Sequence, residues 1–223
     1  MKRKNGKISN AVIRRLPRYR RYLRELQKQG VEKISSNDFS ELIGYTASQI
    51  RQDLNNFGDF GQQGYGYSVD GLYEEVSKIL GLDHDYKMVL VGAGNLGQAI
   101  SKYAMSIIDQ GFQLCAAFDI KPELTGKKVE GITIYPYEEL ESYVSENKID
   151  IGIICVNKGN AQEVADKLYS AGARGIWNFA LVDLVVPEQV ALESVHLADT
   201  LHSLAYHMND IRRKSSGAEG KKK

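Results

Sequence analysis

The chain is poor in cysteine and has no long apolar run. Only Cys115 and Cys155 are present among 223 residues, each in an apolar, strand-like segment where a small buried side chain is expected rather than a disulfide. No segment approaches the roughly 20 apolar residues that span a bilayer. The basic start MKRKNGKISN is followed by more arginine instead of the apolar core of a signal peptide. These absences predict a cytoplasmic protein that does not bind a membrane.

Histidine is also scarce. The four histidines are His84, His196, His202 and His207, and their spacing does not suggest a pair of metal ligands on one helix. A dehydrogenase needs a positioned acid or base and a substrate pocket, and no histidine lies beside the glycine-rich motif at residues 92–97. The sequence therefore predicts no metal site and no catalytic residue.

Charge is unevenly distributed, although its net value is only +1. The first 28 residues hold eleven Lys/Arg and a single acid, Glu25, whereas residues 81–211 are acidic and residues 212–223 are basic again. A basic density of this kind fits either a surface for a polyanion or a solvated tail. Composition by itself leaves both open.

A basic helix is expected at the front of the chain. Its pattern runs from Asn10 to near Gly30, and Pro17 could begin a fresh helix after a short break, since proline is tolerated in a first turn and not in a helix interior. Two shorter helical patterns follow, separated by Gly44 and Tyr45. Two short helices around a tight glycine turn are typical of the helix-turn-helix, whose second helix enters the major groove.

The second short helix carries side chains suited to reading bases. Thr46 and Gln49 form a capping box at its start. Arginine can pair with guanine, and glutamine or asparagine with adenine, although an exposed polar face without a ligand would look similar. The segment GDFGQQGYGYSVD is typical of a tight hairpin, or wing, that enters a minor groove, or of a turn-rich linker. The residues predicted to contact DNA are Arg14, Arg18, Thr46, Ser48, Gln49, Arg51, Gln52, Asn55, Gln63, Gly64 and Tyr65.

A dinucleotide fingerprint, GAGNLG, follows the apolar run KMVLV. A helix and a second strand come after it, which is the context that makes this motif specific. Gly92 permits the tight turn, Gly94 lets the backbone approach a pyrophosphate, and Gly97 lets the helix pack close to the strand. Asp119, about 20 residues further on, should bond the adenosine ribose and repel a 2′-phosphate, which favours NAD(H), while nearby Lys121 softens the exclusion of NADP(H).

The β/α alternation continues through GITIYP, IDIGIICVN and GIWNFA. This rhythm predicts a parallel, doubly wound sheet with its ligand at the carboxyl ends of the strands, where ordinary loop packing is the alternative role for any one residue. The residues predicted to bind the cofactor are Gly92, Ala93, Gly94, Asn95, Leu96, Gly97, Tyr103, Asp119, Ile120, Lys121, Val156, Asn157, Asn178, Phe179 and Ala180.

The segment LADTLHSLAYHMNDI has one apolar helical face. It comes after the nucleotide-binding pattern is complete, so the face packs either on its own domain or on a second subunit, as a palindromic operator would require. The expected organisation is a winged-helix domain over 1–82, a Rossmann domain over 83–195, a dimerisation helix over 196–211 and a disordered basic tail over 212–223.

Taken in order, TASQIRQDL, GQQGYGY, GAGNLG and NFA resemble the Rex family of redox-sensing transcriptional repressors, over residues 8–211. The resemblance implies an α/β chain with an N-terminal winged helix-turn-helix, a Rossmann-type parallel sheet and a domain-swapped C-terminal helix. It implies a homodimer that binds an inverted-repeat operator when NADH is scarce and is released when NADH binds. The alternative is an NAD-dependent oxidoreductase with an N-terminal accessory domain, which explains only the second half of the chain.

The resemblance also implies a set of switch residues. Tyr103 matches the tyrosine that reaches the nicotinamide pocket, and Arg21 matches the first-helix arginine that links the two domains. His196 stands where the family often has an acid, with Asp199 one turn further on, so pH could enter the switch through the histidine. Gln63 and Gln52 stand where members carry basic residues, which weakens the charge expected at the minor groove and alters base preference.

Overall fold

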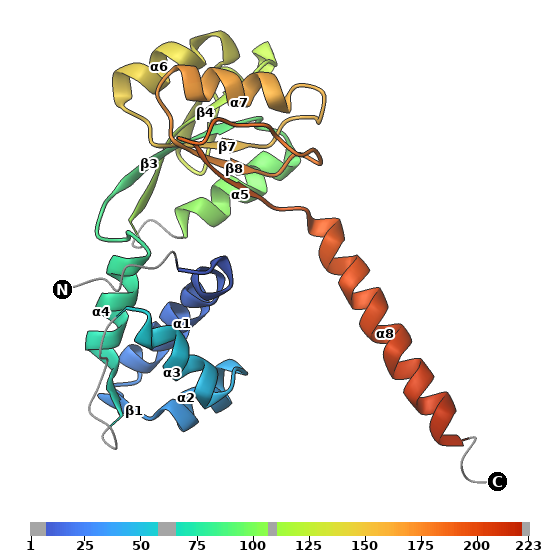
Figure 1. The fold of residues 1–223 in the computed structure, drawn as a ribbon. Coiled ribbons are helices and arrows are strands. Elements are labelled where there is room, and N and C mark those ends of the chain that lie inside the picture. The colour runs from blue at the N-terminus through green and yellow to red at the C-terminus, as the bar shows by residue number, and fades with distance from the viewer. Residues whose placement is uncertain (1–7, 58–65, 107–110, 220–223) are drawn as a thin grey trace. The chain divides into compact units, whose positions relative to one another are not determined.

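The structure, a computed structural model, describes residues 8–57, 66–106 and 111–219. The chain divides into two compact units, Met1–His84 and Asp85–Lys223, and Figure 1 labels their helices and several of their strands. The predicted wing residues Gln63, Gly64 and Tyr65 lie outside the described residues.

The N-terminal unit is a small helical domain with one short β-ladder. The described residues of this unit form four helices. In its core, Leu16, Tyr19 and Leu23 of the first helix pack on side chains of the other three helices, among them Phe39, Ile50 and Leu72. The two strands pair antiparallel, Lys33 with Ser68 and Ile34 with Tyr67. The elements are α1 (Asn10–Lys28), β1 (Lys33–Ile34), α2 (Ser36–Ile43), α3 (Ala47–Asn55), β2 (Tyr67–Ser68) and α4 (Val69–Ile79).

Helix α1 runs through Pro17 without a break, so a restart of the helix at this proline was the wrong alternative. A proline inside a helix removes one hydrogen bond and costs about 3 kcal/mol. The flanking Leu16 and Tyr19 are fully buried in the core of the unit, whereas Pro17 itself is exposed. Tertiary packing on both sides of the proline thus outweighs the local cost.

The C-terminal unit contains a seven-stranded sheet in the order β5-β6-β4-β3-β7-β8-β9. All neighbouring strands are parallel except β5 and β6. The predicted doubly wound sheet is confirmed, and the order reverses beside the first strand, β3, where such sheets bind ligands. The strands are β3 (Tyr86–Val91), β4 (Phe112–Asp119), β5 (Lys128–Val129), β6 (Ile132–Pro136), β7 (Ile151–Ile154), β8 (Gly175–Asn178) and β9 (Ala191–Ser194).

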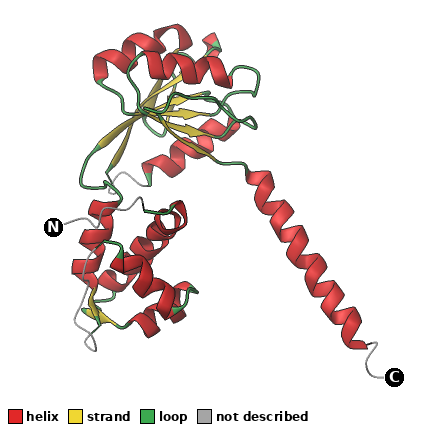
Figure 2. Ribbon diagram, in the orientation of Figure 1, coloured by secondary structure: helices red, strands yellow, loops and turns green. Residues whose placement is uncertain are grey.

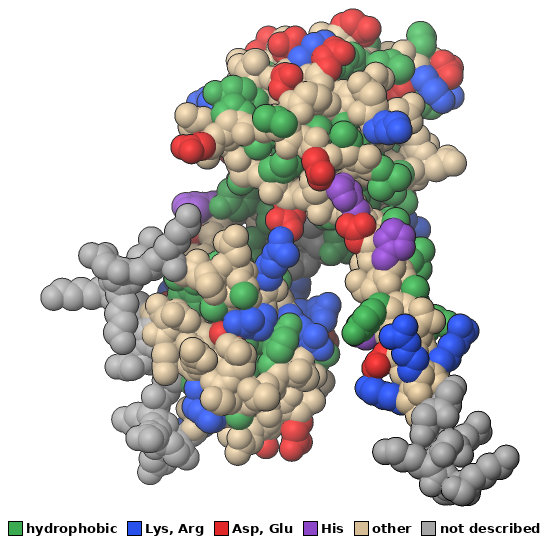
Figure 3. Space-filling view, turned by 45° about the vertical axis from the view of Figure 1, so that its right-hand side comes forward, with side chains coloured by type: hydrophobic (Ala, Val, Ile, Leu, Met, Phe, Trp, Pro, Cys, Tyr) green, Lys and Arg blue, Asp and Glu red, His purple; other side chains and the backbone are tan. Residues whose placement is uncertain are grey.

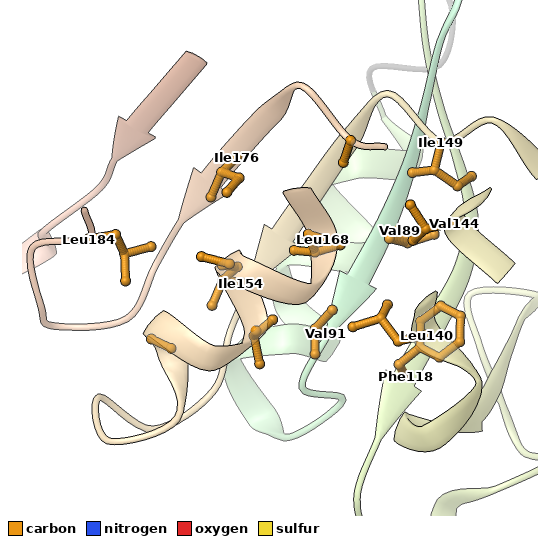
Figure 4. Close-up of a cluster of buried hydrophobic side chains, with 14 of the residues drawn as sticks. Val89, Val91, Phe118, Leu140, Val144, Ile149, Ile154, Leu168, Ile176 and Leu184 are labelled. Atoms are coloured by element: carbon orange, nitrogen blue, oxygen red, sulfur yellow. The ribbon is translucent and has the colours of Figure 1, made fainter. Parts of the chain in front are cut away.

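Helices cover both faces of this sheet (Figure 2). Helices α6 (Leu140–Asn147) and α7 (Ala161–Ser170) lie on one face and α5 (Asn95–Met105) on the other, with short 3-10 turns at Pro122–Leu124 and Tyr137–Glu139. In Figure 4, Leu168 and Val144 from these helices point at Val89, Val91 and Ile154 of the central strands. Burial on both faces explains why the strands read as continuous apolar runs.

Two features of this unit differ from the sequence prediction. Strand β9 was missed, because its residues ALES alternate weakly and follow a loop. Helix α8 spans Leu197–Glu219, so the expectation of a disordered tail from residue 212 is wrong as far as Glu219. Lys214 and Asp210 form an i,i+4 ion pair of 2.7 Å that supports the extra turns.

The apolar face predicted for the terminal helix is exposed in the single chain. Side chains of α8 that lie on this face are more than two-fifths accessible, and no described part of the same chain buries them. They are Leu197, Leu201, Leu204, Met208 and Ile211.

Candidate functional site

The glycine turn after β3 has the geometry that its sequence predicts. Gly92 has a φ of 97°, and a Cβ built there would lie 2.6 Å from the Cys155 carbonyl oxygen. A Cβ on Gly97 would overlap the Gly92 carbonyl oxygen. Around Gly94, in contrast, nothing lies within 4 Å of the Cβ position. Two glycines are therefore required by the fold, while Gly94 leaves open space.

The amino end of α5 faces this space without a capping side chain. Gly94 is its N-cap and supplies no side-chain hydrogen bond. The first N–H groups of a helix carry partial positive charge and bind phosphate when nothing else occupies them. An uncapped helix start above an open glycine suits a pyrophosphate.

A cavity of about 380 Å³ extends from the glycine turn along the carboxyl edge of the sheet. The structure brings seven predicted cofactor residues to it: Gly92, Gly94, Asp119, Ile120, Lys121, Val156 and Asn157. It adds others that the sequence reading missed, namely Tyr137, Asn160, Glu163 and Val164, with Val91, Phe118 and Cys155 beneath them. Tyr137 directly follows the end of β6, so the strand-end rule would have found it.

Asp119 is oriented by the backbone around it. Its Oδ2 accepts a hydrogen bond of 2.7 Å from the Ala93 N–H, and its Oδ1 accepts one of 2.9 Å from the Lys121 N–H. These bonds tie the end of β4 to the glycine turn, and the carboxylate still lines the cavity. Each oxygen keeps acceptor capacity for a ribose hydroxyl.

Glu163 is held at the far side of the cavity. Its carboxylate lies 3.4 Å from the Lys167 ammonium and accepts a bond of 3.4 Å from the Tyr137 hydroxyl, and Lys167 sits 4.4 Å from the Tyr137 ring centroid. Below them, burial raises the pKa of the Cys155 thiol to about 12, so this cysteine is a neutral, apolar part of the floor.

The remaining predicted cofactor residues do not line this cavity. Ala93, Asn95, Leu96 and Gly97 belong to the turn and the first part of α5, and buried Ala180 follows β8. Asn178 is fully buried, and its amide donates to the Val182 carbonyl and the Ser194 hydroxyl and accepts from the Ala180 N–H. Asn178 shapes the loop after β8.

Tyr103 lies in a row of aromatic rings. Its ring centroid is 6.4 Å from that of Trp177, which is 4.7 Å from that of Phe179. Tyr103 itself is 54% exposed, whereas Phe179 is buried. Tyr103 is the exposed end of the row, and Phe179 belongs to the buried core of the unit.

In the N-terminal unit, the helix-turn-helix geometry is confirmed. Gly44 ends α2 with a φ of 69°, in the left-handed region, and the Thr46 hydroxyl caps α3 by accepting a bond of 3.1 Å from the Gln49 N–H. The described side chains of α3 that project to the surface are those of Ser48, Arg51, Gln52 and Asn55. Arg51 donates a bond of 2.7 Å to the Ser36 hydroxyl.

Basic side chains accompany this surface. Arg14, Arg18 and Arg21 of α1 are exposed, and the Arg18 guanidinium lies 5.2 Å from the Tyr45 ring centroid in the turn before α3. Arg21 lies 5.5 Å from the Tyr22 ring centroid. Figure 3 shows basic side chains on the visible face of this unit and again near the end of α8.

At the start of α8, His196 and Asp199 are neighbours. The His196 Nδ1 lies 3.8 Å from the Asp199 carboxylate, and the His196 Nε2 is buried without a hydrogen-bond partner. Among the described residues, no three His, Cys, Asp or Glu side chains cluster as metal ligands do. Within those same ranges, no helix has the length and apolar character to cross a bilayer.

The fold and the two surfaces define a class: a DNA-binding protein that carries its own dinucleotide-binding domain. Residues 7–55 match the family described as "Putative DNA-binding protein N-terminus", and residues 83–182 match "CoA binding domain". The chain belongs to the Rex family of redox-sensing transcriptional repressors, as its relatives show.

Two curated relatives carry the name "Redox-sensing transcriptional repressor Rex". The protein from Thermoanaerobacter pseudethanolicus is 55% identical, with 93% of this chain and 92% of that one covered. The protein from Clostridium beijerinckii is 56% identical, with 93% and 98% covered. The names are those of regulators, and this chain is accordingly a transcriptional regulator rather than an enzyme.

Solved structures of a Rex-family repressor called RSP agree. Its complex with β-NAD+ and operator DNA aligns with a TM-score of 0.87 at 53% identity, covering 96% of this chain and 99% of that one. Its complex with β-NADH aligns with a TM-score of 0.86 at 50% identity, covering 95% and 99%.

Proposed function

We propose that this chain is a cytoplasmic homodimeric repressor that senses the NADH/NAD+ ratio. It binds an inverted-repeat operator when NADH is scarce and leaves the DNA when NADH binds. The proposal rests on the observation that one chain carries both a dinucleotide-type glycine turn that lines a cavity and an exposed recognition helix. The relatives' names and the complexes of RSP with operator DNA and with NADH support it. The proposed boundaries remain 1–82, 83–195 and 196–211, with the helix now extended to Glu219.

The cavity suits the adenosine half of the cofactor. The first turn of α5 and Gly94 would hold the pyrophosphate, and Asp119 would accept hydrogen bonds from the ribose. Ile120 and Val156 are apolar lining residues suited to the flat faces of a base. The cofactor supplies the redox signal through the charge of its nicotinamide.

The aromatic row favours the reduced nicotinamide. Oxidised nicotinamide is cationic and reduced nicotinamide is neutral, so an apolar environment at Tyr103 and Phe179 penalises the oxidised ring through desolvation. A ligand shifts an equilibrium only through such a difference in affinity. Moving a population from 1:99 to 99:1 takes about 5.5 kcal/mol of differential affinity.

DNA recognition would use α3 in the major groove, with α1 on the phosphates. Ser48, Arg51, Gln52 and Asn55 face solvent from α3, as base readers must. Arg14 and Arg18 are exposed on α1 and suited to phosphates. Thr46 caps α3, and Gln63, Gly64 and Tyr65 are assigned to the wing.

The exposed apolar face of α8 would pack on a second copy of the chain. Leu201, Leu204 and Met208 present that face, and a two-fold dimer matches the two halves of an inverted repeat. The residues that we assign to the switch between the two states are Arg21, Tyr103, His196 and Asp199.

Fluorescence anisotropy with labelled operator DNA tests this function. The ligand-free protein should bind the duplex, NADH should release it, and NAD+ at the same concentration should release much less. Operator complexes that survive saturating NADH contradict the proposal. Analytical ultracentrifugation of the same samples should show two chains per operator.

A further inference from the structure

A buried carboxylate joins α3 to α1. Asp53, on the inner side of α3, is 1% exposed. Its Oδ2 accepts bonds of 2.6 Å from the Arg15 Nε and 2.6 Å from the Tyr19 hydroxyl. Its Oδ1 accepts bonds of 2.8 Å from the Arg15 Nη2 and 2.8 Å from the Gln49 Nε2. Four donors thus fill the acceptor positions of a carboxylate.

The four donors keep this carboxylate ionised inside the protein. Burial would raise the pKa of Asp53, but the hydrogen bonds from Arg15, Tyr19 and Gln49 outweigh it, and the pKa lies below its usual value. The hydrogen bonds that Arg15 donates to the Asp53 carboxylate also raise the pKa of the Arg15 guanidinium, despite its partial burial. Removing any one partner of such a cluster leaves a buried charge poorly compensated.

This cluster is a principal link between the two helices. The main packing neighbour of α1 is α4, and that of α3 is α2. Arg15 and Tyr19 come from α1, whereas Gln49 and Asp53 come from α3. Beside the apolar core that both helices share, the directed bonds at Asp53 therefore fix the position of α3 relative to α1.

Gln49 has a different role here from that of its neighbours on α3. A glutamine that reads adenine uses its amide nitrogen and oxygen together, as a donor and an acceptor. The amide nitrogen of Gln49 is donated to Asp53, and the side chain is half-buried. Arg51, Gln52 and Asn55 are exposed.

We propose that Asp53 positions the recognition helix on α1, and that Gln49 belongs to this positioning cluster and does not read a base. The inference rests on the proposed function, since it concerns how the same helix meets DNA. Gln49, Arg15 and Tyr19 are positioning residues that act through Asp53. Base reading falls to Ser48, Arg51, Gln52 and Asn55.

Base preference separates positioning from reading. The full-length Gln49→Ala protein is titrated, without cofactor, against the operator and a panel of duplexes in which each base pair is changed in turn. A positioning role lowers the affinity for every duplex by a similar factor, about three- to tenfold, and leaves the order of preference unchanged. Loss of discrimination confined to one base pair would overturn the proposal.

Gln52→Ala is the matched control on the same helix. Gln52 is exposed and donates no side-chain bond to the cluster, so its truncation should flatten the preference at a single base pair. A Gln49→Ala profile that resembles the Gln52→Ala profile contradicts the positioning role.

A double-mutant cycle provides the second measurement. Asp53→Asn should weaken operator binding by more than tenfold while affinity for unrelated DNA changes little. In that background, Gln49→Ala should weaken operator binding no further, since its partner is already altered. Additive losses would overturn the proposal, and if Asp53→Asn does not fold, the base-preference panel still decides. A wild-type protein that binds operator but ignores NADH contradicts the proposed function, not this inference.

Discussion

The two units present their ligand-facing surfaces in opposite ways. In the N-terminal unit, side chains make the surface: Arg51, Gln52 and Asn55 project from a helix that Asp53 fixes from behind. In the C-terminal unit, the surface for the ligand forms where a side chain is absent. Gly94 leaves space free of protein atoms, and the backbone N–H groups at the start of α5 face that space. One surface depends on which side chain is present, and the other on the absence of one.

This difference separates the consequences of mutation. Truncating an exposed side chain on α3, such as that of Arg51, should remove a contact to one base and leave the scaffold intact. Adding a side chain at the glycine turn either disturbs the fold, as at Gly92 and Gly97, or blocks only the ligand, as at Gly94. The comparison predicts four outcomes, from the largest effect to the smallest.

Gly94→Val should abolish the cofactor response. A Cβ at this position has no protein atom within 4 Å, and the valine side chain occupies the space of the pyrophosphate, so NADH affinity should fall by more than about 100-fold, or ~2.7 kcal/mol. Isothermal titration calorimetry measures the affinity, and operator binding without cofactor should be unchanged. An equal melting temperature of the ligand-free proteins is the control, and a normal NADH response in this variant would break the comparison.

Arg51→Ala should weaken operator binding by about 10- to 100-fold, since a bidentate arginine–guanine contact contributes about 1–3 kcal/mol. NADH affinity should stay the same. Fluorescence anisotropy with operator DNA and with unrelated DNA shows how much of the lost affinity is specific to the operator sequence. Equal losses on both duplexes would mean that Arg51 contacts a phosphate and not a base.

Asp119→Asn should weaken NADH binding by about tenfold, because a hydrogen bond to a charged acceptor contributes about 1.5–3 kcal/mol. NADPH binding should improve relative to NADH, since the substitution removes a charge that repels a 2′-phosphate. Calorimetric titrations with NADH and with NADPH measure the ratio of the two affinities. An unchanged ratio would show that Asp119 serves only to hold the glycine turn through Ala93.

Arg18→Ala should have the smallest effect, a change in the salt dependence of DNA binding. Each phosphate contact that is lost reduces the slope of log K against log salt by about 0.9. The slope is measured by anisotropy between low and moderate salt. Lys78→Ala is a matched control, since Lys78 on α4 is exposed and pairs with Glu75, and its slope should equal that of the wild type.

The sequence predicted most of the architecture because its signals are local. The GAGNLG turn, the Thr46 cap and the Gly44 turn each depend on residues a few positions apart, and all three are present. The capping box predicted for Thr46 and Gln49 is only half formed, because the Gln49 side chain bonds Asp53 and not the Thr46 N–H. Pro17 and strand β9 were not resolved correctly from the sequence. Packing between distant segments decides both, and a local pattern does not contain it.

The candidate sites show the same limit. Strand-end positions found Asp119, Val156 and Asn157, but Glu163 enters the cavity from the first turn of α7, at a place that no motif marks. Asn178 ends a strand as a cofactor ligand would, and in this structure its side chain bonds the loop after β8 and Ser194 of β9. The sequence does not distinguish Arg15 from the other arginines of α1, because its role depends on its hydrogen bond to Asp53 of a different helix.

The sequence by itself determined the two kinds of domain, their order and the position of the glycine turn, since these follow from periodicity and from conformations that only certain residues adopt. Only the tertiary structure decided which side chains face a ligand and which face each other. Gln49 has the chemistry of a base reader, yet its amide bonds a buried carboxylate. A buried charge must be compensated by the donors around it, so the fold and not the residue type assigns Gln49 its partner.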